Sequence, residues 1–149
     1  MRTCKGGDLL KIMPAKTPIS PHFSEDFSFK YKVTYGPEQH EYHTHKQFDI
    51  IFMLTPNTVC HVSEKNWKVP KNSIILFNNM DLHKITLNTR ERFERYTLSF
   101  KPEYIESLSS KETDLLECFF LRPFSNPYIL PLTISQAEEC LAQLKRLVA

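Results

Sequence analysis

Three of the six histidines of this 149-residue chain lie in one short run, residues 40–45, which leads into an apolar segment. If the run is extended, alternate side chains point to the same face, so His43, His45 and Asp49 would share one face of a strand. The imidazoles of such a His-x-His pair start about 7 Å apart at the backbone and can converge on one small ion or polar group. This run is therefore the first candidate for a binding site.

A fourth histidine could join the group from a distant part of the chain. In the segment 83–87, His83, Ile85 and Leu87 alternate with more polar residues, so the apolar face is expected to carry His83 inward. The candidate ligands are then His43, His45, Asp49 and His83. Nitrogen and oxygen donors of this kind can hold a divalent ion and leave positions open for water or a ligand. The plainer interpretation is a surface pair of histidines and a buried histidine that is merely hydrogen-bonded.

Arg95 and Thr97 are the other candidates for contacts with a ligand. They alternate with the apolar residues of the segment that ends at Phe100, so the two sets occupy opposite faces of one strand. If the polar face lines a barrel, the Arg95 guanidinium could pair with a carboxylate or with two hydroxyls of a sugar. If the aromatic face lines it, Arg95 is solvated, and alternation alone does not decide between the two. His40 and His61 are interpreted as bystanders.

Short β-strands are expected to position these side chains. Residues 27–35 alternate strictly between apolar and polar, and residues 48–55 form an apolar strand that continues from the histidine run. Further short strands follow at intervals of roughly ten residues, separated by turn signals and with no helical pattern between them. This pattern favours a β-sandwich or barrel that ends at Pro102.

Helical patterns follow the barrel. Residues 102–108 predict a short turn, residues 111–121 a helix, and residues 123–131, with their three prolines, a connector. The last helix could begin with a capping box of Ser135 and Glu138. Its apolar residues repeat at three-four spacing, as an a/d seam made of Ile134, Ala137, Leu141, Leu144 and Val148. The seam could pack on the barrel or pair with the same helix of a second copy.

Composition excludes several classes of protein. The net charge is +2, from 19 basic and 17 acidic residues, without a basic run that would serve as an electrostatic footprint for DNA. The cysteines are widely spaced and the chain has no membrane-length apolar stretch or signal peptide, so free thiols and a cytoplasmic location are expected. No nucleophile motif or phosphate-binding glycine loop is present, which counts against covalent catalysis but not against metal catalysis.

The order of these motifs resembles the cupin superfamily and, more closely, the ligand-sensing domains of AraC-type transcriptional regulators. The shared parts are a histidine-rich entry strand (41–49), an apolar strand (50–54), a turn (70–72), an Asn-x-x-x-x-His loop (78–83) and a closing strand ending in Phe-x-Pro (98–102). The resemblance covers roughly residues 25–149. The chain departs from the family at Asp49, where glutamate is usual, and in lacking the turn glycines.

The resemblance implies a mainly β fold, a cupin double-stranded β-helix (jelly-roll) barrel followed by C-terminal α-helices. It divides the chain into an N-terminal arm (1–26), a sensor barrel (27–102) and a helical dimerisation segment (103–149). The chain stops at Ala149 in the middle of a helical pattern, as if cut from a longer protein in which a DNA-binding helix-turn-helix domain follows.

The resemblance also implies a function without catalysis. A small effector, a sugar or an organic acid, would bind at His43, His45, Asp49, His83 and Arg95, and the first four could also hold a divalent metal ion. The partners would be a second copy of the chain, through the C-terminal helices, and DNA only through the missing domain. The alternatives are a free-standing metal-dependent cupin enzyme, such as an oxygenase or isomerase, and a plain dimerisation module with a vestigial pocket.

Overall fold

The computed structural model describes residues 26–122 and 127–148. The arm expected over residues 1–26 lies outside the described residues except for Asp26, and so does part of the connector expected over residues 123–131. No helix among the described residues is long and apolar enough to cross a lipid bilayer.

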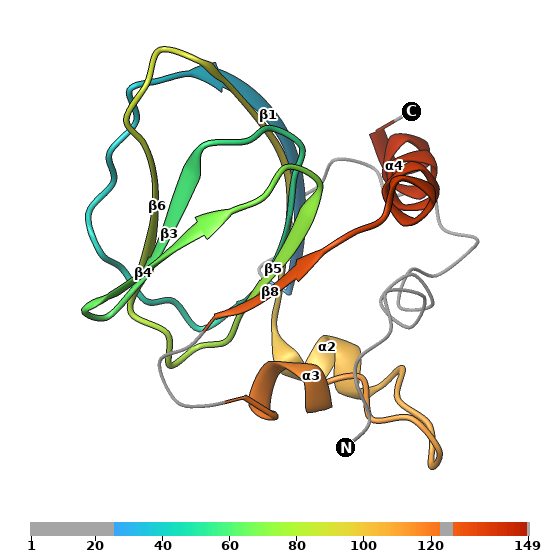
Figure 1. Cartoon of the computed structure of the whole chain (residues 1–149). Helices are drawn as coiled ribbons and strands as arrows, with labels where there is room; N and C mark the ends of the chain where they lie inside the picture. The colour runs from blue at the N-terminus through green and yellow to red at the C-terminus, as the bar shows by residue number, and fades with distance from the viewer. Residues whose placement is uncertain (1–25, 123–126, 149) are drawn as a thin grey trace.

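Two antiparallel β-sheets form a barrel (Figure 1). The five-stranded sheet has the order β1 (Phe27–Tyr35), β7 (Arg92–Phe100), β2 (Phe48–Met53), β5 (Ser73–Phe77), β8 (Tyr128–Pro131). The three-stranded sheet has the order β4 (Lys65–Val69), β3 (Thr58–Val62), β6 (His83–Leu87). The chain changes sheet after β2, β4, β5 and β6, and this repeated crossing joins the two sheets into one closed structure. The short strands expected between residues 27 and 102 are confirmed, except for the strand expected over the histidine run.

One hydrophobic core fills the space between the two sheets. Its buried members come from both sheets and are Ile51, Met53, Cys60, Val62, Val69, Ile75, Phe77, Leu87 and Phe93. Aromatic side chains buried in this way remove 150–250 Å² each from water and dominate the energy of a small core. Cys60, Cys118 and Cys140 are free thiols, as predicted for these three cysteines.

A second core covers the outer face of the larger sheet. It combines Phe48, Ile50 and Phe52 of β2 and Tyr96, Leu98 and Phe100 of β7 with side chains of the C-terminal segments. Strand β2 is therefore buried on both faces, which explains why residues 50–53 are apolar without alternation. Strand β7 alternates, with Tyr96, Leu98 and Phe100 buried and the residues between them only partly buried. Because even-numbered residues of β7 face the helices, Arg95 and Thr97 face the space between the sheets. The polar face of β7, and not its aromatic face, therefore lines the interior of the barrel.

The helices after the barrel are α2 (Pro102–Glu106), α3 (Glu117–Phe120) and α4 (Ile134–Val148). The helix predicted over residues 111–121 is confirmed only over its last turn. The hydroxyl of Ser110 accepts hydrogen bonds from the backbone N–H groups of Glu112 and Thr113, which offers this stretch an alternative to helical bonds. The prediction of a connector up to residue 131 is wrong at its end, where β8 pairs with β5.

Helix α4 begins and packs differently from the prediction. The capping pair is Thr133 and Gln136, whose side chains each bond the other residue's backbone N–H, at 3.2 and 3.0 Å, so Ser135 is not the cap. The predicted seam is only partly correct. Ala137, Cys140 and Leu144 are buried against the larger sheet, whereas Ile134 is 77% exposed. One face of α4 therefore belongs to the outer core.

Substitutions on α4 should report this packing. We expect Leu144→Ala to lower the free energy of unfolding by about 2–4 kcal/mol, because Leu144 is 5% exposed and its loss leaves a cavity. Urea denaturation followed by circular dichroism measures this value. Ile134→Ala on the same helix is the control and should change it by less than about 0.5 kcal/mol. Equal effects of the two substitutions would contradict the packing described.

Candidate functional site

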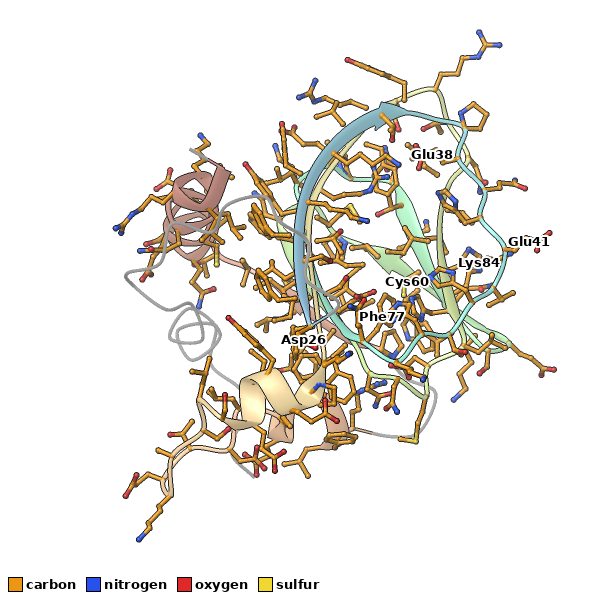
Figure 2. The ribbon with its side chains drawn as sticks, turned by 180° about the vertical axis from the view of Figure 1, so that it is seen from behind. Asp26, Glu38, Glu41, Cys60, Phe77 and Lys84 are labelled. Atoms are coloured by element: carbon orange, nitrogen blue, oxygen red, sulfur yellow. The ribbon has the colours of Figure 1, made fainter. Side chains whose placement is uncertain are left out.

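The histidine run approaches the barrel as an irregular segment and not as a strand. Strand β2 begins only at Phe48, and the segment between β1 and β2 is attached to β6 by two isolated bridges, Glu38 with Leu87 and His43 with His83. The expectation of an extended strand over residues 40–47 is therefore wrong. Figure 2 shows this segment along the side of the barrel opposite β1, with Glu41 turned outward.

The two halves of the histidine motif meet directly. His43 and His83 exchange both backbone hydrogen bonds, each 3.1 Å long. The ring centroids of His43 and His83 are 4.5 Å apart, and those of His45 and His83 are 5.4 Å apart. Each of the three imidazoles brings one nitrogen to within 4.8 Å of the others. The structure thus brings His43, His45 and His83 together, and we call them the histidine cluster.

A cavity of about 140 Å³ lies beside the histidine cluster, between the sheets. Its polar lining is His40, His43, Asp49, His83, Arg95 and Thr97, and its apolar lining is Ile51, Ile85 and Phe93. A closed cavity of about 150 Å³ holds a molecule the size of benzene. His40, interpreted from the sequence as a bystander, is part of this lining. Only its place in the same run as His43 could have indicated this.

His83 is held in one orientation at the closed end of the cluster. Its side chain is 3% exposed and stacks on the Phe77 ring, with centroids 3.9 Å apart. Its Nδ1 lies 2.8 Å from the backbone carbonyl of Asp81. A carbonyl can only accept, so Nδ1 donates and Nε2 keeps its lone pair for the cluster. Burial, with a smaller contribution from His43 and His45, lowers the pKa of His83.

His45 and Asp49 form an ion pair within the site. His45 Nε2 lies 3.0 Å from Asp49 Oδ2, and its Nδ1 lies 2.8 Å from the carbonyl of Gln47. Both partners are acceptors, so both ring nitrogens donate and the imidazole is protonated in this arrangement. The hydrogen bond to Asp49 accordingly raises the pKa of His45, against the effect of burial. The other carboxylate oxygen of Asp49 accepts a hydrogen bond of 2.6 Å from Ser99. Asp49 therefore lies in the cavity lining without joining the histidine cluster.

Arg95 lies on the cavity wall with its charge matched by a glutamate. Its Nη1 donates to the Thr34 hydroxyl and to the Phe93 carbonyl, at 3.0 and 3.2 Å, and its guanidinium lies over the Phe93 ring. Its Nη2 is 3.5 Å from Glu38, and both side chains are largely buried. Burial lowers the pKa of Arg95, and the charge of Glu38 acts in the opposite direction. Thr97 lies two residues after Arg95 in β7, on the same face, and also lines the cavity.

His61 lies outside the site, as predicted. Its two ring nitrogens bond the side chains of Asn66 and Thr86, at 2.5 and 2.8 Å. The neighbouring residues Cys60 and Val62 belong to the core between the sheets, so alternation directs His61 to the other face of β3.

The donors of the histidine cluster suit a divalent metal ion. Three imidazole nitrogens with a fourth position open form a common zinc arrangement, and imidazole also suits nickel, copper and iron. Ligand nitrogens about 2.0–2.1 Å from a tetrahedral ion lie about 3.3 Å apart, so the cluster would have to contract from its spread of 4.8 Å. His45 would also have to give up the proton that it shares with Asp49.

Comparisons with known proteins agree with the architecture. A family model described as the AraC-like ligand binding domain matches residues 31–149. Among solved structures, ToxT from Vibrio cholerae matches with a TM-score of 0.60 and 11% identity, over 80% of this chain and 47% of that chain. ToxT from V. cholerae O395 bound to (E)-4-(8-methylnaphthalen-1-yl)but-3-enoic acid matches with a TM-score of 0.58 and 10% identity, over 80% and 48%.

The chain spans about half the length of the ToxT chains that it matches. A cupin 2 conserved barrel domain protein from Salinispora arenicola matches with a TM-score of 0.49 and 16% identity, over 64% of this chain and 76% of that chain. No match was found among curated proteins. The fold is thus mainly β, a cupin double-stranded β-helix with a C-terminal helix, as predicted.

His45 and His83 should titrate on opposite sides of the value near 6.5 of an unperturbed histidine. A folded-state pKa raised at His45 contributes stability that is complete below about pH 6.5 and is lost as pH rises through the folded-state pKa. A folded-state pKa lowered at His83 contributes stability that is present above about pH 6.5 and is lost as pH falls through the folded-state pKa. NMR titration of the imidazole carbons resolves the two residues.

Asp49→Asn provides the matching substitution. It removes the negative charge that favours the protonated form of His45, so the pKa of His45 should fall while that of His83 stays below 6.5. His61, which lies outside the site, serves as the internal control. An unchanged pKa of His45 in this variant would contradict the ion pair.

Proposed function

The chain belongs to the family of AraC-like ligand binding domains, and from this premise we propose that it is the effector-sensing and dimerising part of a transcriptional regulator. The observation that carries the proposal is the polar cavity beside His83, which is lined by residues from the segment before β2 and from β2, β6 and β7. Most ligand sites combine apolar walls with a few convergent polar groups. We assign effector binding to His43, His45, Asp49, His83 and Arg95, as the sequence predicted, and add His40 and Thr97.

The size of the cavity limits the effector. A volume of about 140 Å³ admits a molecule of roughly the size of benzene. The naphthalene-bearing acid bound to ToxT has two fused rings and an acid chain, so only part of it would lie within the lining residues of this cavity. We therefore infer a smaller, more polar effector for this chain.

The charges of the cavity limit the chemistry of the effector. The positive charge of Arg95 is matched by Glu38, and the negative charge of Asp49 by protonated His45. Without a metal, an anion would find no uncompensated positive charge, so a small neutral polyol or sugar fits best. It could donate to Asp49 and accept from Arg95 and Thr97. A divalent metal ion in the histidine cluster would add positive charge and favour a small organic acid, whose carboxylate could also reach Arg95.

The mechanism that we propose is thermodynamic linkage. The effector binds one arrangement of barrel and helices better than another, and this differential affinity changes how a DNA-binding domain elsewhere in the protein meets its target. The chain's own residues bind and orient the effector without altering it. In this scheme the barrel of residues 27–102 senses, residues 103–149 dimerise, and the arm of residues 1–26 belongs to the sensor.

The second candidate function is a metal-dependent cupin enzyme. The observation that favours it is the histidine cluster, since three imidazole ligands with an open position can support metal-assisted chemistry. The metal-binding prediction that follows applies to both functions. Turnover of a bound substrate by the metal-loaded protein would favour the enzyme.

Divalent metal ions should stabilise the protein through the histidine cluster. A metal present at about 100 times its dissociation constant adds about 2.7 kcal/mol, which for this chain length raises Tm by about 5–10 °C. We expect Zn²⁺ or Ni²⁺ to produce this shift in protein purified without chelator. His83→Gln should abolish the shift, because His83 holds the only fully buried imidazole of the cluster. His61→Gln, which changes a histidine outside the cluster, should leave it intact. Equal shifts in the two variants would exclude the cluster as the metal site.

Arg95 should discriminate among effectors. A thermal-shift screen of small polyols, sugars and hydroxy acids, with and without Zn²⁺, is expected to identify polyols or sugars in the metal-free protein and hydroxy acids in the loaded protein. Arg95→Lys keeps the charge but loses the planar fork. It should weaken binding of the identified ligand about 10–100-fold, the value of one hydrogen bond to a charged group. Arg92→Lys, on the exposed end of β7, is the control. Unchanged affinity in Arg95→Lys would remove Arg95 from the site.

A further inference from the structure

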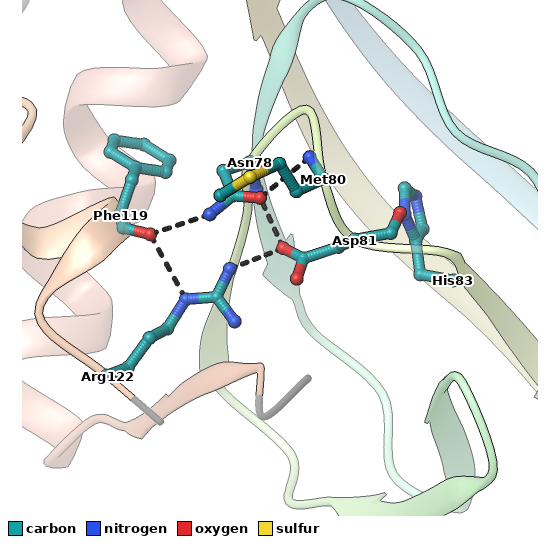
Figure 3. A network of polar contacts seen from close by, with 6 residues as sticks. All are labelled: Asn78, Met80, Asp81, His83, Phe119 and Arg122. Carbon is teal, nitrogen blue, oxygen red and sulfur yellow. Dashed lines mark hydrogen bonds and ion pairs between the residues drawn. The ribbon is translucent and has the colours of Figure 1, made fainter. Parts of the chain in front are cut away.

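The loop between β5 and β6 carries buried polar side chains that do not line the cavity (Figure 3). The carboxylate of Asp81 accepts a hydrogen bond of 2.8 Å from the backbone N–H of Asn78, and it forms an ion pair with Arg122. The side chains of Asp81 and Arg122 are 5% and 7% exposed. Removing one member of a pair buried this deeply leaves an uncompensated charge away from water. The pair therefore fixes the loop to the segment that follows α3.

A second connection joins the same loop to α3 itself. The backbone carbonyl of Phe119 accepts hydrogen bonds from Asn78 Nδ2 and from Arg122 Nε, at 3.0 and 3.2 Å (Figure 3). The Phe119 ring packs against Phe48 and Phe100 of the larger sheet, with centroids 5.1 and 5.7 Å apart. The carbonyl of Phe119 thus joins the loop to α3, and its ring joins α3 to the sheet, although Asn78 and Phe119 are 41 positions apart in the sequence.

The backbone of Asp81 orients His83, the buried histidine of the cavity. The backbone carbonyl of Asp81 accepts from His83 Nδ1 at 2.8 Å, and this bond decides which ring nitrogen is left for a ligand. Asp81 is therefore bonded to His83 through its backbone and to Arg122 through its side chain (Figure 3). A displacement of Asp81 would alter both contacts together.

We propose that Asp81 and Arg122 are positioning residues that link occupancy of the cavity at His83 to the position of α3. The inference rests on the proposed function, because it concerns the regulation of the same cavity. Linkage is reciprocal: a ligand on His83 stabilises the contacts of α3, and changes in those contacts alter the affinity for the ligand. Since α3 precedes β8 and α4 in the chain, this connection gives the cavity a route toward the helix proposed to dimerise.

The test uses the variant Asp81→Asn/Arg122→Gln, which removes both charges together and leaves neither one unpaired. The probe is Zn²⁺ alone, measured by calorimetry at pH 7 and by amide hydrogen exchange of residues 117–122. We expect Zn²⁺ to slow exchange of this segment in the wild-type protein. In the double variant the affinity for Zn²⁺ should fall about 10–100-fold, as for other groups that orient a metal-binding histidine. The protection of residues 117–122 should be lost.

A spectroscopic readout separates orientation of His83 from simple loss of stability. Nitrogen-15 NMR of the imidazole should show the Nδ1–H tautomer of His83 in the wild-type protein and a mixture of tautomers in the double variant. Leu121→Ala, which changes an exposed side chain of the same segment, is the control and should preserve both the tautomer and the affinity for Zn²⁺. If the double variant does not fold, Arg122→Lys replaces it. This variant keeps the charge but loses the Nε bond to Phe119, and it should reduce the protection of α3.

The outcomes are distinct. Wild-type affinity for Zn²⁺ and unchanged protection of α3 in the double variant would overturn the linkage. If the wild-type protein binds no Zn²⁺, the metal-binding part of the proposed function fails, and the tautomer of His83 decides the linkage by itself. Loss of the Nδ1–H tautomer in the variant then supports the proposal, and its retention overturns it.

Discussion

The cavity depends on one constraint, which is that β2 and β7 pack against other parts of the chain on both faces. Their even-numbered side chains enter the outer core beneath the C-terminal segments, and their odd-numbered side chains face the smaller sheet. Burial of Tyr96, Leu98 and Phe100 on one side therefore delivers Arg95 and Thr97 to the cavity on the other. A slip of one residue would exchange the two sets and place a guanidinium under the helices. The apolar helices thus specify the polar lining of a cavity that they do not touch.

Local pattern was enough to predict the strands but not the direction of the polar groups. Strict alternation gave the boundaries of β1 and β6 and the end of β7, because the period of a strand is a property of the backbone. Which face of β7 is inside depends on its packing against other segments, from β1 to α4, so alternation could not supply it. For the histidine run, in contrast, the strand prediction is wrong and the convergence of the side chains is correct. Its expected strand is absent, yet His43 and His83 meet, because two pairs of backbone hydrogen bonds, at His43 with His83 and at Glu38 with Leu87, join the segment to β6.

The predictions for the C-terminal segments were wrong for one shared reason, which is competition between local and distant interaction partners. Side-chain bonds from Ser110 replace the first turns of the helix expected over residues 111–121. Strand β8 tolerates Pro131 because the residue is the last of an edge strand, where a missing N–H costs little. At α4, Thr133 caps the helix two residues before the expected Ser135, and the buried face rotates to include Cys140 instead of Ile134. Only the packing surface decides between such closely spaced alternatives.

The aspartate at position 49 has a physical consequence for the site. The carboxylate of Asp49 contacts His45 and Ser99, at 3.0 and 2.6 Å, and it stays outside the histidine cluster. A metal ion needs the deprotonated imidazole of His45, whereas Asp49 stabilises the protonated one, so proton and metal compete for the same nitrogen. Binding of a metal must therefore break the pair and release a proton. The Asp49 carboxylate would then be free to bind a ligand, at the same time as the metal ion gives the cavity a net positive charge. Replacement of the His45 proton by a metal ion would therefore change both the charge of the cavity and its hydrogen-bonding groups.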